Sequence, residues 1–154
     1  MAVHRLRDTW NRSIDSYIAR SEVSRDTFIK AGLPAGKVVV KPNFVHPDPG
    51  LRAHNSGYAL FMGRLSPEKR VSTILSAWAR INNNIPLLVV GGGPERNSLE
   101  EEARRQGLNS IQFKGYVSRP EALAIISGAR FLIFSSEWYE HFPVTIAESF
   151  ACGV

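Results

Sequence analysis

The sequence lacks several features that would place it in an oxidising compartment or in a membrane. It holds one cysteine, Cys152, which excludes an internal disulfide framework and a metal site built from several cysteines. No run approaches the roughly 20 apolar residues of a membrane helix, and the amino terminus has no apolar core of a secretory signal. These absences predict a cytoplasmic protein.

Strong charge of one sign is also lacking. The formal net charge is +5, and the Lys and Arg residues are spread along the chain rather than gathered in blocks. This pattern does not favour nucleic acid as a partner. It leaves open both the binding of an anionic small molecule and a peripheral association with the cytoplasmic face of a membrane.

Apolar runs and helical patterns alternate along the 154 residues, 44% of which are hydrophobic. Short strands are expected near residues 15–20 and 37–41, around a helix near 22–31. A connector rich in proline and glycine follows, and we place a domain boundary there, between residues 48 and 49. The chain therefore divides into residues 1–48 and 49–154.

The second part predicts a Rossmann-like α/β domain. Its strands are continuous apolar runs separated by helices, which is typical of a parallel sheet covered by helices on both faces. Strands are expected at residues 58–63, 86–92, 110–115 and 130–136, and helices at 66–84, 94–107, 118–128 and 143–153. The first of these helices is expected to begin with Ser66 as its N-cap and Pro67 in its first turn. Its apolar stripe makes Trp78 a core residue.

Ligands of open α/β sheets bind at the carboxyl ends of the strands, so the loops after the strands hold the candidate site residues. In "MGRLSPEK", Gly63 lets a ligand approach the backbone, and Arg64 and Lys69 lie beside a helix start. Two cations at a helix N-terminus suit a diphosphate. By itself the stretch fits equally well an exposed Arg and Lys at a helix entry.

The stretch "VVGGGPERN" carries three glycines after a strand. Arg96 stands where the dinucleotide fingerprint requires its third glycine, and no Lys-Ser/Thr pair completes a P-loop. We therefore favour a tight turn, although Gly92 and Gly93 leave room for a substrate to approach.

The stretch "EHFPVTIAE" holds two glutamates in unequal settings. The residue before a proline resists the helical conformation, so the helix should begin at Pro143. Glu140 then lies in the loop, and Glu148 lies about five residues into the helix. A carboxylate, a helix N-terminus and a second carboxylate follow the order of sugar hydroxyls, diphosphate and ribose hydroxyls in a nucleotide sugar. Alternatively, Glu140 is a solvated loop residue and Glu148 belongs to a helix-surface pair.

Other residues near Glu140 are ambiguous. Trp138 and Tyr139 either wall a sugar site or close the core, and we favour the core. A lone loop histidine such as His141 is more often incidental than functional. A glycosidase could also use two carboxylates, but it has no need for a cationic phosphate cradle.

The segments "YALFMGRLSPEK", "LLVVGGGPERNSLE" and "IQFKGYVSRPEALAIISGARFLIFSSEWYEHFPVTIAESFACG" resemble the retaining nucleotide-sugar glycosyltransferases of the GT-B fold, in particular the family 4 (group 1) type. Residues 12–49 look like the end of the acceptor-side domain and the linker of that family. The resemblance implies that residues 1–48 are the tail of the N-terminal acceptor-side domain with the linker. Residues 49–154 would then be part of the C-terminal donor domain.

The resemblance also implies roles for single residues. Arg64 and Lys69 would bind the donor diphosphate and stabilise the leaving group, and Glu140 would contact the transferred sugar. These three are the predicted catalytic residues. The full set predicted to bind the donor is Gly63, Arg64, Lys69, Glu140, His141, Phe142, Pro143, Val144 and Glu148. Pro143 stands where the family often has glycine, so one potential phosphate donor N–H is absent.

No cofactor and no metal are expected, because the strand-end loops hold no Asp-x-Asp cluster and the two cations neutralise charge instead. The expected partners are a nucleotide diphosphate sugar and a glycan, lipid or small-molecule acceptor. The chain stops where another apolar strand is expected, so we expect a truncated chain that is inactive alone. Two alternatives stay open: a non-catalytic nucleotide-sugar-binding or partner module, and a GT-B nucleotide-sugar epimerase.

Overall fold

A computed structural model describes residues 8–52, 56–81 and 85–154. The chain forms two compact units, which are described separately. The first unit comprises residues up to Phe44 together with His141–Pro143. The second comprises Val45–Glu140 and Val144–Val154.

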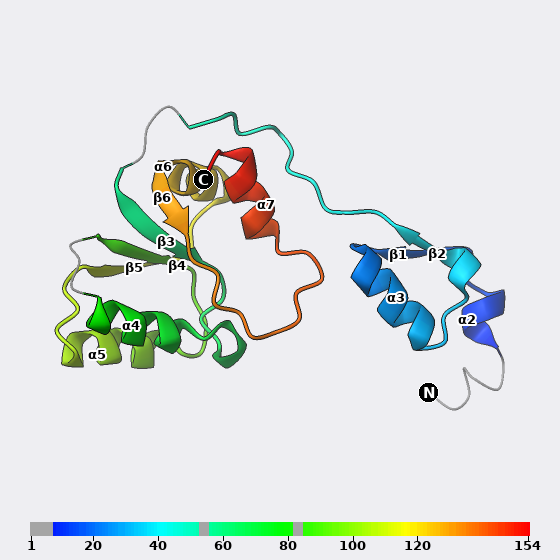
Figure 1. Cartoon of the computed structure of the whole chain (residues 1–154), viewed down its shortest axis with the longest axis horizontal. Helices are drawn as coiled ribbons and strands as arrows, with labels where there is room; N and C mark the ends of the chain where they lie inside the picture. Colours follow the sequence, from blue (N-terminus) through cyan, green and yellow to red (C-terminus); the bar gives the residue numbers. More distant parts are fainter. Residues whose placement is uncertain (1–7, 53–55, 82–84) are drawn as a thin grey trace. The chain divides into compact units, whose positions relative to one another are not determined.

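The first unit is a small β-α-β arrangement, which confirms the predicted order of strand, helix and strand (Figure 1). Its elements are α2 (Thr9–Arg12), β1 (Tyr17–Ala19), α3 (Glu22–Lys30), the 3₁₀ helix η1 (Ala35–Lys37) and β2 (Val38–Val40). The two strands pair in parallel, with Tyr17 opposite Val38. Helix α3 begins at a capped end, because the Ser21 hydroxyl accepts a hydrogen bond from the Ser24 N–H at 3.2 Å.

The second unit is built on a four-stranded sheet in which all neighbouring strands are parallel. Its strands are β3 (Tyr58–Met62), β4 (Leu87–Val90), β5 (Ile111–Gly115) and β6 (Ala129–Leu132), in the order β5-β4-β3-β6. Its helices are the 3₁₀ helix η2 (Pro67–Lys69), α4 (Val71–Arg80), α5 (Arg96–Arg105), α6 (Arg119–Gly128) and α7 (Val144–Ala151).

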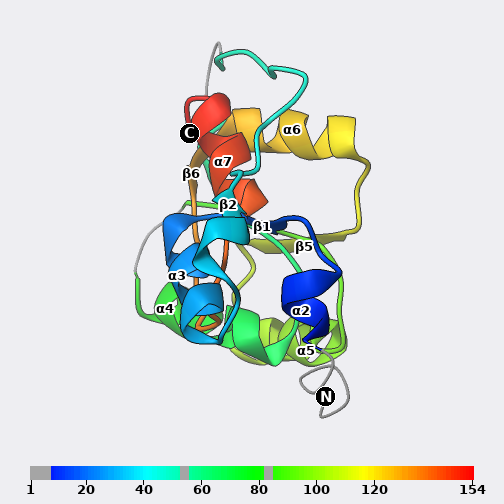
Figure 2. The same ribbon diagram turned by 90° about the vertical axis from the view of Figure 1, so that its right-hand side faces the viewer.

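Helices cover both faces of this sheet, with α4 and α5 on one side and α6 and α7 on the other (Figures 1 and 2). Successive residues of a strand point to opposite faces, and β3 follows this rule. Ala59 and Phe61 belong to the core cluster that contains the buried residues of α4 and α5, whereas Leu60 packs with Ile126 of α6 and Cys152. The predicted parallel sheet with helices on both faces is therefore confirmed.

Helix α4 confirms one prediction and corrects another. Trp78 is buried, as are the other residues of its stripe, Val71, Ile74 and Leu75. The single helix expected from Ser66 is wrong, because η2 ends at Lys69, Arg70 adopts a left-handed conformation (φ 52°, ψ 41°) and α4 begins at Val71. The end predicted for this helix, residues 82–84, lies outside the described residues.

Hydrogen bonds from Ser66 itself and from a distant loop account for the break between η2 and α4. The Ser66 hydroxyl donates to Glu68 Oε1 at 2.6 Å and does not cap the helix. The carbonyls of Glu68 and Lys69 accept hydrogen bonds from the Glu137 N–H at 3.0 Å and the Ser135 hydroxyl at 2.6 Å. The loop after β6 therefore stabilises the two helices as separate elements rather than as one continuous helix.

Candidate functional site

The candidate site lies at the carboxyl edge of the four-stranded sheet. Strands β3 and β6 are parallel neighbours, so the loops that follow them emerge at the same edge. The loop after β3 carries Gly63, Arg64 and Lys69, and the loop after β6 carries Glu140. The edge is thus the place that the strand-end rule predicts for a ligand.

The two loops are joined through backbone and side chains. In addition to the hydrogen bonds of Ser135 and Glu137, Arg70 Nε lies 2.6 Å from Glu137 Oε2. This ion pair raises the pKa of the Arg70 guanidinium, chiefly through its hydrogen bond to Glu137. These contacts connect the residues that follow β3 to the loop that follows β6.

Lys69 and Glu140 meet between these loops, although 71 residues separate them in the chain. Lys69 Nζ donates directly to Glu140 Oε1, and the Ser136 hydroxyl donates to the same oxygen at 3.2 Å. The two side chains are 23% and 25% exposed, so the pair is sheltered but still accessible from solvent. The structure therefore brings two of the three predicted catalytic residues into contact.

Arg64 lies in the same connection between β3 and α4 as Lys69, and it is exposed. Its charge contributes to the lowered pKa of Glu68. The largest cause of that lowering is the hydrogen bond from Ser66, followed by a hydrogen bond from the Glu68 backbone and by the charges of Arg64 and Lys69. Both cations thus act on one carboxylate of the loop after β3. Their role as the holders of a diphosphate stays a prediction.

The glycine run after β4 supports the loop after β3. The Leu65 N–H donates to the Gly92 carbonyl at 2.9 Å. A Cβ at Gly91 would lie 1.9 Å from the Gly63 carbonyl oxygen, and one at Gly93 would lie 2.2 Å from that of Leu65. The glycines are therefore required because another backbone approaches them, which agrees with the preference for a turn over a dinucleotide fingerprint.

Glu148 lies in the second turn of α7 and is only 8% exposed, although the side chain of its ion-pair partner is 53% exposed. Its Oε1 lies 3.2 Å from Nη1 of Arg119, at the start of α6. Arg119 was not predicted as a site residue. The signal that could have found it is its position just after β5, at the same carboxyl edge of the sheet.

The residues between Glu140 and α7 belong to the first unit. The Nδ1 atom of His141 lies 2.8 Å from the hydroxyl of the buried Ser24, and its ring lies 6.3 Å from that of Phe28. Phe142 and Pro143 are half-buried. Helix α7 starts at Val144, which is one residue after the predicted start.

Trp138 and Tyr139 are 67% and 61% exposed. The preference for placing them in the core is therefore wrong. They follow Glu137, whose exposed side chain faces Arg70 at the loop surface, so the loop carries them outward instead of folding them under the sheet. Their alternative role as the wall of a sugar site stays a prediction.

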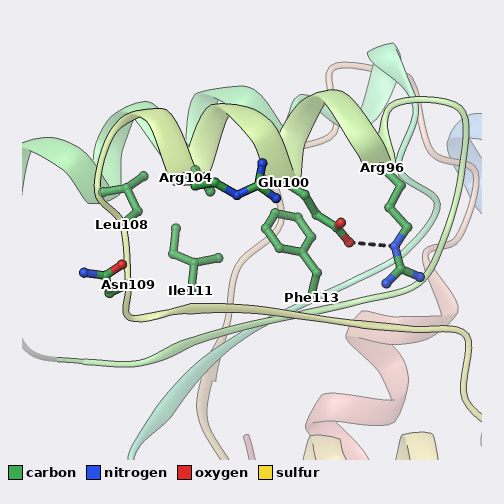
Figure 3. Close-up of a pocket in the computed structure, with 8 residues that line it drawn as sticks. Arg96, Glu100, Arg104, Leu108, Asn109, Ile111 and Phe113 are labelled. Atoms are coloured by element: carbon green, nitrogen blue, oxygen red, sulfur yellow. Dashed lines mark hydrogen bonds and ion pairs between the residues drawn. The ribbon is translucent and has the colours of Figure 1, made fainter.

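A surface groove of about 530 Å³ lies elsewhere, between α5 and the edge strand β5 (Figure 3). Ile111 and Phe113 point from β5 toward α5, and Arg96 donates to Glu100 at 2.8 Å along the rim. None of its lining residues belongs to the predicted donor site. Arg96 pairs with Glu100 there, and Arg104 is a second cation that lines the groove.

Within residues 8–52, 56–81 and 85–154, no three His, Cys, Asp or Glu side chains gather in an arrangement that could hold a metal ion. No helix in those same segments has the length and apolar character to span a bilayer.

The comparisons with known proteins identify the family. The model of the family "Glycosyl transferases group 1" matches residues 46–154, which is more than two thirds of the chain. The chain belongs to the group 1 glycosyltransferases. The match covers both loops at the carboxyl edge and helix α7, so the candidate site lies within this family's domain.

Two curated relatives illustrate the range of this glycosyltransferase family. The uncharacterized glycosyltransferase YqgM of Bacillus subtilis is 26% identical over 148 residues, covering 92% of this chain and 41% of the relative. The alpha-monoglucosyldiacylglycerol synthase of Streptococcus pneumoniae is 32% identical over 98 residues, covering 61% of this chain and 22% of the relative. The chain thus spans less than half the length of either relative.

A solved structure shares the fold of the chain. Anabaena Alr3699/HepE, crystallised in complex with UDP and glucose, superposes with a TM-score of 0.81 at 23% identity. The superposition covers 97% of this chain and 46% of that protein. The parallel sheets with helices on both faces are those of the GT-B glycosyltransferases.

Proposed function

We propose that this chain is the donor-binding half of a retaining glycosyltransferase of the family 4 type, whose donor is a nucleotide diphosphate sugar. The observation that carries the proposal is the contact between Lys69 and Glu140 at the carboxyl edge of a group 1 glycosyltransferase domain. A cation and a carboxylate held side by side match the two halves of such a donor. In this proposal residues 1–48 end the acceptor-side domain and form the linker, and residues 49–154 form part of the C-terminal donor domain.

The diphosphate is bound by cations, whereas the sugar is bound by a hydrogen-bond acceptor for its hydroxyls. Lys69 and Arg64 neutralise the diphosphate and stabilise the charge that develops on it as the sugar leaves. Each charge-assisted hydrogen bond to the phosphates contributes about 1.5 to 3 kcal/mol. The donor replaces Glu140 as the partner of Lys69, and Glu140 then accepts hydrogen bonds from sugar hydroxyls.

The remaining predicted residues complete the proposed donor site. Glu148 accepts hydrogen bonds from the ribose hydroxyls, and the backbone of His141 and Phe142 lies near sugar and phosphate. Gly63, Pro143 and Val144 line the approach to the helix N-terminus. No metal is needed in this scheme, because the two cations supply the positive charge.

The acceptor class follows from the family only in outline. The name of the Streptococcus pneumoniae relative refers to a glycosylated diacylglycerol, and this supports a lipid as one acceptor class for the intact protein. A lipid acceptor would be reached by peripheral association of a cytoplasmic enzyme with the membrane face, for which the net charge of +5 is favourable. A glycan or a small molecule is the other acceptor class.

The first experiment uses the intact protein that contains this chain. A thermal-shift screen of nucleotide sugars is expected to find at least one that raises the melting temperature, since a ligand of the native state stabilises it. Product analysis by NMR with candidate acceptors should then find a glycoside with the anomeric configuration of the donor. An inverted product would contradict retention, epimerised donor would indicate the epimerase, and binding without any turnover would indicate the binding module.

A pair of matched variants tests the site itself. Lys69→Met is expected to weaken nucleotide-sugar binding by about 10- to 100-fold, the loss of one charge-assisted hydrogen bond. Lys30→Met removes an exposed lysine at the end of α3 and should leave affinity unchanged. Equal affinity of both variants would refute the placement of the diphosphate.

A further inference from the structure

Glu148 is a buried carboxylate with a single cation beside it. The whole residue is 8% exposed, and Arg119 Nη1 lies 3.2 Å from its Oε1. Among the described residues, Arg119 is its one ion-pair partner and no hydrogen-bond donor to Oε2 is found. A buried charge is costly unless it is paired, and Arg119 supplies the opposite charge that faces Glu148.

Arg119 is itself held in place at its two ends. Its backbone begins α6, where the Ser118 side chain accepts a hydrogen bond from the Glu121 N–H at 3.4 Å. Its guanidinium contacts Glu148 through Nη1 and the His46 carbonyl through Nη2, at 3.5 Å. Because a guanidinium is planar and rigid, a second contact fixes the direction of the first.

This geometry assigns different tasks to the two oxygens of Glu148. Oε1 faces Arg119, while Oε2 remains free to accept a hydrogen bond from a ligand. We propose that Arg119 is a positioning residue of the nucleotide site, which pairs with Oε1 of Glu148 and so turns its Oε2 toward the ribose of the donor. The inference rests on the proposed function, because it takes Glu148 as the acceptor of the ribose hydroxyls.

Two substitutions separate charge from geometry at this position. Arg119→Met removes the cation with similar side-chain bulk, whereas Arg119→Lys keeps a positive charge but loses the planar fork. Arg105→Met is the matched control, because Arg105 is an exposed arginine at the end of α5, away from Glu148. The double variant Arg119→Met/Glu148→Gln removes both charges and so avoids an unpaired buried carboxylate.

The measurement is calorimetric binding to the intact protein. UDP, ADP and GDP are tested first, and the one that binds best is compared with its 2′,3′-dideoxy analogue. The intact wild-type protein should prefer the natural nucleotide by about 10- to 100-fold, the value of one charge-assisted hydrogen bond. Arg119→Met should lose most of this preference, Arg119→Lys part of it, and Arg105→Met none.

The double variant distinguishes positioning from a structural role. Its melting temperature should recover relative to Arg119→Met, because no buried charge is left unpaired. Its preference for the natural nucleotide should stay lost. If Arg119→Met keeps the full preference for the natural nucleotide, with or without weaker overall binding, the positioning role is refuted while the proposed function stands. If the wild-type protein binds none of these nucleotides and no nucleotide sugar raises its melting temperature, the proposed function fails and this inference fails with it.

Discussion

Gly91 offers a quantitative test of how the loop after β3 is held. Its φ of +127° lies in a region that residues with side chains rarely adopt, and a Cβ there would lie 1.9 Å from the Gly63 carbonyl oxygen. The Gly63 N–H is bonded to the Val90 carbonyl at 3.0 Å, so the obstructing backbone cannot simply withdraw. Backbone strain costs about 1 to 3 kcal/mol and overpacking about as much again, so Gly91→Ala should destabilise the protein by about 2 to 6 kcal/mol.

Two other glycines separate the effect of backbone strain from the effect of overpacking. Gly107 has a φ of +68° but nothing within 4 Å of the position that a Cβ would take, so Gly107→Ala should cost about 1 to 3 kcal/mol through strain alone. Gly36 has neither a positive φ nor a neighbour within 4 Å, and Gly36→Ala should stay within about 0.5 kcal/mol of wild type. Urea unfolding of the intact protein gives all three values.

The same substitutions connect packing to ligand binding. Gly91→Ala pushes on the loop that carries Arg64, so it should also weaken nucleotide-sugar binding, whereas Gly107→Ala should not. A Gly91→Ala variant as stable as Gly36→Ala, with unchanged affinity, would refute the argument that the glycine run exists to seat this loop.

Three further outcomes are expected. Trp78→Ala should lower the free energy of unfolding by about 3 to 5 kcal/mol, because Trp78 is 8% exposed in the core. Trp138→Ala should lower it by less than about 0.5 kcal/mol, because Trp138 is exposed. Thermal unfolding compares the two variants. Glu68 has a lower pKa in the folded protein than its ordinary 4.5, so its contribution to stability is present above that pH and is lost as the pH falls through the lowered value. Ser66→Ala removes the largest cause and should raise the pKa of Glu68 in an NMR titration. Burial raises the pKa of the Cys152 thiol, so mass spectrometry should find it unmodified by thiol reagents until the protein unfolds.

The order of the elements could be predicted from the sequence because it depends on local patterns. Continuous apolar runs such as "LLVV" indicate buried parallel strands, and the stripe that includes Trp78 indicates a helix packed on a sheet. The break at Arg70 could not be predicted, because it depends on Ser135 and Glu137, which bond to the preceding carbonyls from a distant part of the chain. Local propensity favours one helix there, and tertiary hydrogen bonds override it.

In the candidate site, too, the positions of the residues could be predicted from the sequence, whereas their tertiary contacts could not. The strand-end rule placed Lys69 and Glu140 at one edge, and the structure brings them into contact. The rule does not give side-chain partners, so neither the direct ion pair nor the burial of Glu148 against Arg119 could be derived from spacing. Trp138 and Tyr139 are exposed because a strand-end loop does not have to return its aromatic residues to the core.

The most direct test of the account compares two variants with two ligands in the intact protein. Lys69→Ala should weaken binding of a nucleoside diphosphate far more than binding of the nucleoside, because the lysine neutralises phosphate charge. Glu148→Ala should weaken both ligands to a similar extent, because the ribose is common to them. If calorimetry finds that both variants bind the nucleoside diphosphate as tightly as the wild-type protein, the carboxyl edge of the sheet is not the donor site.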